Sequence, residues 1–255
     1  MEAFSAFQAA YGGEVKNFDV SITKPEIGGD VRTLVAFGGR AALVAYPPEP
    51  DLVYCMSPGV FVKSQARKGK TVKISMVPAF GEIFLRIRQI QPTIKRLRIF
   101  WTAPEFGGYI GKFKAQGEAL GLEISAVEVG GGGELPAVLR ESGGAMDAFW
   151  VPPDPLLLTP ENMMILREFS WANSVPFYGS SKGVTRAGAI ASVGMSFRDI
   201  GEAAAKAALG LAAGEILPPV IFPEKLEITL NATAAKKCGL TFPRDILREA
   251  GEPLP

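Results

Sequence analysis

Histidine is absent from this chain of 255 residues. Its absence removes the commonest general base, the Ser-His-Asp and Cys-His nucleophile systems, and every metal site that uses an imidazole. Cysteine is nearly absent: Cys55 and Cys238 lie far apart and form no CxxC motif, which excludes zinc-ribbon and thioredoxin-like sites. We expect both thiols to be buried among apolar side chains, with a disulfide between them as the alternative.

Excess charge and long apolar runs are missing as well. A net charge of +1, with 21% charged residues, lacks the basic excess of nucleic-acid-binding proteins, so no nucleic-acid partner is expected. No apolar run reaches the roughly 18 residues that span a bilayer. Residues 1–4 contain neither the basic nor the apolar part of an export signal, so the sequence as written predicts an unexported chain.

What the sequence does contain is a regular alternation of apolar and amphipathic segments, in a chain long enough for one large domain or two lobes. From about Val72 onward, short apolar runs are followed by longer amphipathic stretches, which is typical of βαβ units and a parallel sheet. We expect strands over residues 52–56, 73–77, 97–101, 123–129, 148–151, 176–178, 190–193 and 226–230. Helices are expected over 1–11, 107–120, 134–142, 160–173 and 197–213. The predicted fold class is α/β, in which ligands bind at the carboxyl ends of the strands.

Several segments of the second half follow one another in a recognisable order. They are DAFWVPPDP at 147–155, LTPEN at 158–162, VPFYGSS at 175–181, RAGAIAS at 186–192 and DIGEAA at 199–204, closed by 226–231 and 239–240. This series resembles the ABC-transporter substrate-binding protein family that includes the tryptophan- and tyrosine-binding lipoproteins. Each segment alone is a weak signal, and the common order makes the series specific. The likeness is thinner upstream and faint before residue 70.

The resemblance implies the type I periplasmic-binding-protein architecture: two doubly wound parallel-sheet lobes, a hinge of three chain crossings, and a ligand enclosed between the lobes. The crossings are expected near Pro78, Val193 and Pro223. This predicts a first lobe of 1–78 with 194–222 and a second lobe of 79–193 with 223–255. Members of the family begin with an export signal or lipobox and then a strand, and neither is visible here. A misplaced start codon, a trimmed chain or a first lobe without that strand would each explain the difference.

Ligand-binding candidates follow from the ends of the expected strands. On the first lobe, we expect the hydroxyl of Ser57 and the backbone N–H groups of a following helix, with Gly59, to hold a carboxylate. A simple N-cap is the alternative role of Ser57. On the second lobe, the segment after residue 101 supplies Thr102 for a hydrogen bond.

Four further candidates are assigned to the second lobe. Phe106 and Tyr109 could stack on the ligand, and Glu105 and Phe80 complete the set. The alternative for these aromatic rings is that they close the core of the lobe.

Asp154 is the sharpest single candidate, because it follows an apolar strand and stands between two prolines. We expect its carboxylate to pair with a ligand ammonium, and the alternative is that it satisfies local backbone donors. Ser180 and Ser181 follow the next strand and are expected at the same edge. Arg186 is expected to form a salt bridge between the lobes, with binding of an anion as the alternative.

The sequence therefore predicts a non-catalytic solute-binding component of an ABC importer, without cofactor or metal. Its expected ligand is a small polar molecule, foremost an amino acid of aromatic or branched-chain type, and its expected partner is an ABC permease in the membrane. The family implies a periplasmic or other extracytoplasmic location, associated with the membrane. One alternative is a ligand-sensing domain of a signalling system. The other is an enzyme on the same scaffold that uses Asp154, Glu105 and Lys182 for acid–base chemistry.

Overall fold

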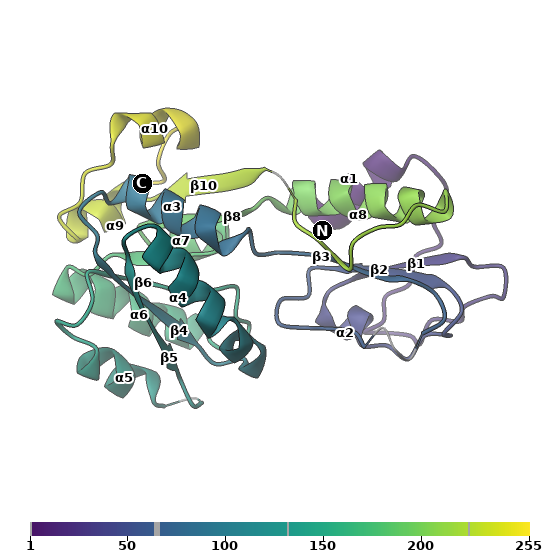
Figure 1. The fold of residues 1–255 in the computed structure, drawn as a ribbon, viewed down its shortest axis with the longest axis horizontal. Coiled ribbons are helices and arrows are strands. Elements are labelled where there is room, and N and C mark those ends of the chain that lie inside the picture. The colour runs from purple at the N-terminus through teal and green to yellow at the C-terminus, as the bar shows by residue number, and fades with distance from the viewer. Residues whose placement is uncertain (1, 64–66, 132, 224) are drawn as a thin grey trace. The chain divides into compact units, whose positions relative to one another are not determined.

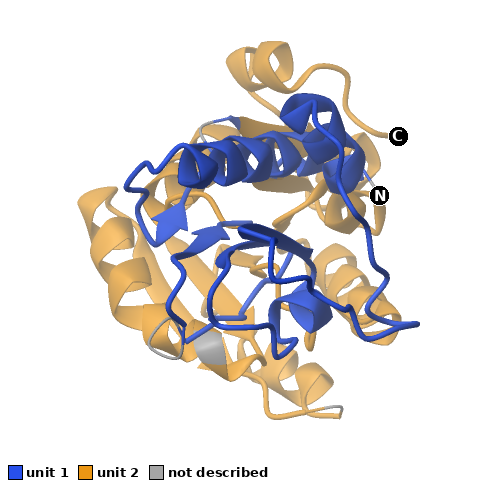
Figure 2. Ribbon diagram, turned by 90° about the vertical axis from the view of Figure 1, so that its right-hand side faces the viewer, with its two compact units in different colours: residues 1–76, 195–225 blue, residues 77–194, 226–255 orange. Residues whose placement is uncertain are grey.

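The computed structural model describes residues 2–63, 67–131, 133–223 and 225–255, and of Glu105 it describes the backbone only. The chain forms two compact units (Figure 2). Unit 1 contains residues 1–76 and 195–225, and unit 2 contains residues 77–194 and 226–255. The chain thus passes between the units three times, at 76/77, 194/195 and 225/226, where 78/79, 193/194 and 222/223 were expected.

Unit 1 is built on a four-stranded sheet with the strand order β1-β2-β3-β9, and all its neighbouring strands are parallel. Its strands are β1 (Thr33–Phe37), β2 (Asp51–Cys55), β3 (Thr71–Ile74) and β9 (Val220–Ile221). Its helices are α1 (Glu2–Tyr11), α2 (Gly39–Ala42) and α8 (Phe197–Ala212). Side chains alternate between the two faces of β2, so Leu52 and Tyr54 join the apolar cluster on the α2 face.

Helices α1 and α8 of unit 1 pack side by side (Figure 1). The contact is close because Gly201 of α8 has no side chain: a Cβ there would lie 2.0 Å from the carbonyl oxygen of Ala3. Ser196 caps the start of α8, and its hydroxyl accepts a hydrogen bond from the Asp199 N–H at 3.0 Å. Ala3 and Phe7 of α1 are buried in this contact region.

Unit 2 is built on a six-stranded sheet with the strand order β10-β8-β7-β6-β4-β5. Its strands are β4 (Arg96–Trp101), β5 (Glu123–Glu128), β6 (Ala148–Trp150), β7 (Phe177–Gly179), β8 (Ala191–Met195) and β10 (Leu226–Leu230). Its helices are α3 (Phe80–Ile90), the 3-10 helix η2 (Pro104–Tyr109), α4 (Ile110–Ala119), α5 (Leu135–Glu141), α6 (Pro160–Asn173), α7 (Lys182–Arg186), α9 (Ala232–Lys237) and α10 (Arg244–Ala250). The pairs from β5 across to β8 are parallel.

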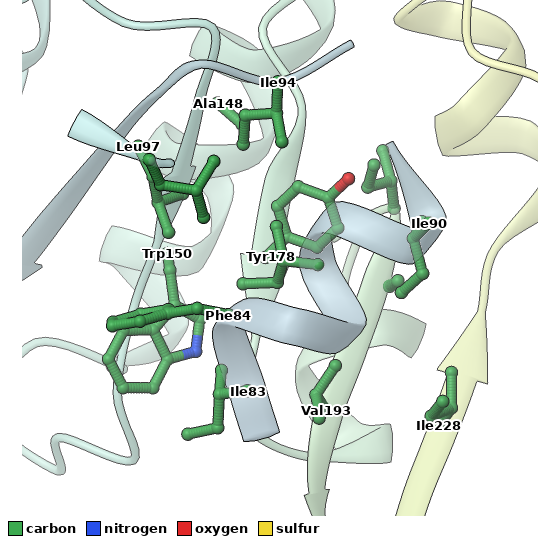
Figure 3. Packing of buried hydrophobic residues seen from close by; sticks show 14 of the residues in the cluster. Ile83, Phe84, Ile90, Ile94, Leu97, Ala148, Trp150, Tyr178, Val193 and Ile228 are labelled. Atoms are coloured by element: carbon green, nitrogen blue, oxygen red, sulfur yellow. The ribbon is translucent and has the colours of Figure 1, made fainter. Parts of the chain in front are cut away.

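The central strands β6, β7 and β8 are buried throughout, as expected for a parallel sheet that is covered on both faces. Trp150 faces α3, where its ring meets Phe84 edge to face at 6.1 Å between centroids (Figure 3). Its neighbour Phe149 points to the opposite face and stacks on Phe177 at 4.9 Å. The second face is covered by side chains of α5 and α6, among them Leu139 and Leu166.

The expected α/β class with parallel sheets in two units is confirmed. The elements that were not expected include β1, the two-residue β9, the eleven-residue α3 and the short helices α2, α7 and α10. The helix expected over 107–120 is divided into η2 and α4. Cys55 and Cys238 are both buried free thiols. In the described residues, every helix is too short or too polar to cross a membrane.

Candidate functional site

The carboxyl edge of the unit 2 sheet gathers most of the expected ligand-binding residues. Strands β4, β6 and β7 are adjacent and parallel, so the segments that follow them lie at one edge. These segments contain Thr102, Asp154 and the pair Ser180-Ser181. The sheet thereby brings together residues that are separated by up to about eighty positions in sequence.

Asp154 is fully buried, and four backbone N–H groups surround its carboxylate. Oδ2 accepts hydrogen bonds from the N–H groups of Thr102 at 2.6 Å and Ala103 at 2.8 Å. Oδ1 accepts from Leu156 at 2.9 Å and Leu157 at 3.2 Å. These contacts fit the alternative role, in which the carboxylate satisfies backbone donors, and they reach a loop about fifty residues upstream as well as the local turn.

The aromatic candidates form a contiguous group. The ring of Phe80, the first residue of α3, lies 5.3 Å from that of Tyr109 and 4.5 Å from that of Phe113, centroid to centroid. Phe106 is buried beside Trp101 and Ala103, while Phe80 and Tyr109 are half-buried. Phe106 therefore serves the core, and Phe80 and Tyr109 also pack against the core of unit 2 with part of each side chain exposed.

Ser180 and Ser181 begin the segment after β7. The Ser180 side chain is buried, and its hydroxyl has no hydrogen-bond partner among the residues that the structure describes. Ser181 stands at the start of the five-residue helix α7 without a side-chain cap bond. An unpaired buried hydroxyl costs about 1–3 kcal/mol, and the side-chain polar atoms of Trp150 and Thr185 in the same unit also lack a partner among the described residues.

Unit 1 has a comparable group at the carboxyl edge of its own sheet. Ser57 follows β2 and is 1% exposed, and its hydroxyl also lacks a partner in the described part of the chain. The preceding Met56 has a positive φ of 52°, an uncommon conformation for a non-glycine residue. Gly59, with φ of 72°, closes a turn in which the Val60 N–H donates to the Ser57 carbonyl at 3.2 Å.

The helix expected after Ser57 is not found in residues 57–63. The turn at Pro58 and Gly59 takes its place. The glycine at 59 favours this turn, because it readily adopts the positive φ. Both the N-cap role of Ser57 and its anion-binding role require a helix that starts there, and residues 57–63 contain none.

The remaining candidates are the ionisable residues Glu105, Lys182 and Arg186. The side chain of Glu105 lies outside the described residues, and Lys182 and Arg186 are exposed on α7. Within the described ranges, no group of three or more acidic or cysteine side chains could hold a metal ion.

Two residues of this edge were missed by the sequence analysis. Trp101 ends β4, and its buried indole N–H has no partner in the described chain. Gly194 of β8 lets the backbone of Ser180 approach: a Cβ at 194 would lie 2.1 Å from the Ser180 carbonyl oxygen. A tryptophan at a strand end was a usable signal for Trp101. The need for Gly194 depends on a contact between strands and has no local signature.

Comparison with protein-family models gives one match, described as ABC transporter substrate binding protein, over residues 78–253. This region covers more than half of the chain. A comparison of the chain with curated protein sequences gives no match.

Solved structures with the same fold cover nearly the whole chain. An ABC domain from Streptococcus pneumonia in complex with L-Trp aligns with a TM-score of 0.73 at 18% identity, over 99% of this chain and 94% of that one. A conserved domain protein from Vibrio cholerae aligns with a TM-score of 0.68 at 17% identity, over 98% and 83%. The ligand-free, open form of a substrate binding protein with adhesive properties from Clostridium difficile aligns at 0.64 and 17% identity, over 84% and 75%. At these identities the likeness shows the fold.

Proposed function

Because the chain belongs to the ABC transporter substrate-binding protein family, we propose that it is a non-catalytic receptor that binds an amino acid and passes it to an ABC permease. The family supports a solute-binding role and a membrane permease as partner. Its members work outside the cytoplasm, which makes an extracytoplasmic, membrane-associated location part of the same proposal.

The observation that carries the proposal is the buried Ser180 hydroxyl without a partner at the carboxyl edge of the unit 2 sheet. Native proteins pair nearly all their buried polar groups, and this hydroxyl lies at the edge where ligands bind in α/β sheets, which supports its role as a ligand contact. The Ser57 hydroxyl is the corresponding group at the edge of the unit 1 sheet. A serine hydroxyl can donate to a carboxylate and accept from an ammonium, and both groups are present in an amino acid.

The half-buried rings of Phe80 and Tyr109 support an amino acid with an apolar or aromatic side chain. They are 5.3 Å apart at their centroids and border the loop that contains Thr102. Aromatic pairs prefer such edge-to-face arrangements, and a ligand ring could join the same group. The relative from Streptococcus pneumonia was solved with L-Trp, which makes tryptophan the first ligand to test.

A thermal-shift screen against the twenty amino acids and a set of small carboxylates tests the proposal. A ligand that binds the native state raises stability by RT ln(1 + [L]/Kd), so at a hundred times Kd the gain is about 2.7 kcal/mol. We expect a clear rise in Tm with one aromatic or branched-chain amino acid, and a smaller rise for Ser180→Ala at the same concentration. Folded protein that responds to none of the amino acids would contradict the amino-acid assignment.

A further inference from the structure

Two aspartates tie the β4 and β6 segments of unit 2 together, one at each end of the strands. Asp147 directly precedes β6, and its Oδ2 accepts from the backbone N–H groups of Lys95 and Arg96, each at 2.9 Å. Asp154 follows β6 and accepts from Thr102 and Ala103 after β4. The two side chains thus make the same kind of link at the amino and carboxyl ends of one strand pair.

The two links differ in their surroundings. Asp147 also binds the guanidinium of Arg96, with Oδ1 2.8 Å from Nη2, and its side chain is 26% exposed. Asp154 is 0% exposed, and its described partners are backbone N–H groups. Each oxygen of a carboxylate has two lone pairs, so four N–H donors fill the acceptor capacity of Asp154.

The division of donors at Asp154 couples two loops. One oxygen serves Thr102 and Ala103, which lead into η2, and the other serves Leu156 and Leu157, which lead toward α6. A single planar carboxylate fixes its two oxygens relative to each other. A displacement of either loop therefore strains the hydrogen bonds between Asp154 and the other loop. Such charge-assisted hydrogen bonds are stronger than neutral ones.

We propose that Asp154 is a positioning residue that holds the loops after β4 and β6 as one unit, so that both are ordered before a ligand arrives. Loops that are already ordered lower the entropy cost of ligand binding. This consequence rests on the proposed function. It replaces the expected direct pairing of Asp154 with a ligand ammonium, because the four lone pairs are already used. Thr102 and its neighbours then contact the ligand, and Asp154 acts through them.

Amide hydrogen exchange of the ligand-free protein tests the coupling directly. In Asp154→Asn one oxygen becomes an NH₂ group, which faces two N–H donors and can accept from neither. We expect exchange at Thr102, Ala103, Leu156 and Leu157 to accelerate together, by tenfold or more. Acceleration confined to Leu156 and Leu157, or unchanged exchange at all four amides, would overturn the proposal.

Asp147→Asn is the matched control, because it makes the same chemical change at the opposite end of the same strands. We expect faster exchange at Lys95 and Arg96 and unchanged exchange at the four amides around Asp154. If Asp147→Asn loosens those four amides equally, the effect is a general loss of stability and the coupling is refuted.

A second variant keeps the test decisive if Asp154→Asn does not fold. Ala103 has φ of −67° and ψ of 121°, which suits proline, so Ala103→Pro deletes one donor to Asp154 with little backbone change. We expect faster exchange at Leu156 and Leu157, although the substitution lies in the other loop. Unchanged exchange there would show that the two loops are independent.

Titration with L-Trp gives the functional readout. If L-Trp binds the wild type, we expect a Kd at least tenfold higher for Asp154→Asn and an unchanged Kd for Asp147→Asn, with both compared well below their Tm. An unchanged Kd for Asp154→Asn would refute the role in binding. Absence of L-Trp binding to the wild type counts against the proposed ligand, while the exchange experiment still decides the coupling.

Discussion

At the scale of single residues, the ion pair of Asp147 and Arg96 makes the stability of unit 2 depend on pH. Burial opposes ionisation of Asp147, but the hydrogen bonds from Arg96 and Lys95 outweigh it and lower the pKa of this carboxyl below its usual 3.8. A carboxyl whose pKa is lower in the folded chain stabilises the fold above its unfolded pKa. That contribution is lost as the pH falls through the folded value.

We therefore expect the difference in Tm between wild type and Asp147→Asn to be largest near neutral pH and to narrow steadily below about pH 4. Thermal unfolding followed by circular dichroism at several pH values measures it. Asp245→Asn is the control, since it removes the same charge from an exposed pair with Arg248. A difference that is constant with pH, or that matches the control, would contradict this role of Asp147.

The two thiols are expected to be inert in the folded protein. Burial raises the pKa of Cys55 to about 12, and burial also raises the pKa of Cys238. Thiolate is the reactive form, so at pH 8 we expect no labelling by Ellman's reagent in the native state and two thiols after denaturation without reductant. Fast labelling of a native thiol would show that it is accessible, and fewer than two thiols after denaturation would show oxidation.

Residue patterns predicted the positions of Asp154 and Ser180 at strand ends, but they could not predict their partners. The donors of Thr102 and Ala103 reach Asp154 only because β4 and β6 are neighbours in the sheet. The lack of a partner at the Ser180 hydroxyl likewise depends on the packing around it. The sequence therefore predicted which residues lie at the carboxyl edge of the sheet. Their hydrogen-bond partners depend on the tertiary structure and could not be predicted.

At the scale of elements, the contact of α1 with α8 depends on Gly201. A methyl group at this position would lie 2.0 Å from the Ala3 carbonyl oxygen and 3.0 Å from the Phe7 nitrogen, and backbone atoms cannot rotate away. We expect Gly201→Ala to destabilise the protein by about 1–3 kcal/mol through overpacking. Denaturant unfolding measures the change.

Gly111→Ala is the control for that experiment, because Gly111 lies on α4 and a Cβ there meets no atom within 4 Å. We expect its stability to be unchanged or slightly raised, since alanine favours the helix. Equal loss in the two variants would show that helical glycines matter in general and that the α1–α8 contact is not close in solution.

The helices α6 and α3 show why one helix was predicted and another was missed. Helix α6 starts with a capping Thr159 and a proline at 160, and both of its expected ends agree with the structure. Helix α3 begins at Phe80 without any side-chain cap and with a glycine as its second residue, so its sequence carries no start signal. It is a helix because Ile83, Phe84 and Ile87 bury one face against the sheet.

At the scale of the whole molecule, unit 2 is completed by the last part of the chain. Strand β10 and helices α9 and α10 come after the third crossing. This part of the chain, with the loop between α9 and α10, supplies Ile228, Leu230, Phe242 and Ile246 to the core that also contains Trp150. The backbone N–H of Asn231 binds the carbonyl of Ile190, which ties the end of β10 to the start of β8. Residues 77–194 alone therefore leave one side of their core open.

We expect a chain that ends at Lys225 to lose the fixed packing of unit 2, because each large apolar side chain that stays exposed forgoes about 1.5–3 kcal/mol of burial. Loss of the near-ultraviolet circular dichroism of the buried Trp150, together with binding of the dye ANS, would report this. A chain that ends at Ala250 is the control. It loses the bridge of Asn231 to Leu254 but keeps the core residues, so a lower Tm with intact tertiary signal is expected. A native spectrum from the chain that ends at Lys225 would mean that unit 2 folds without its final strand, and that the crossing at 225/226 adds an accessory segment to a complete domain.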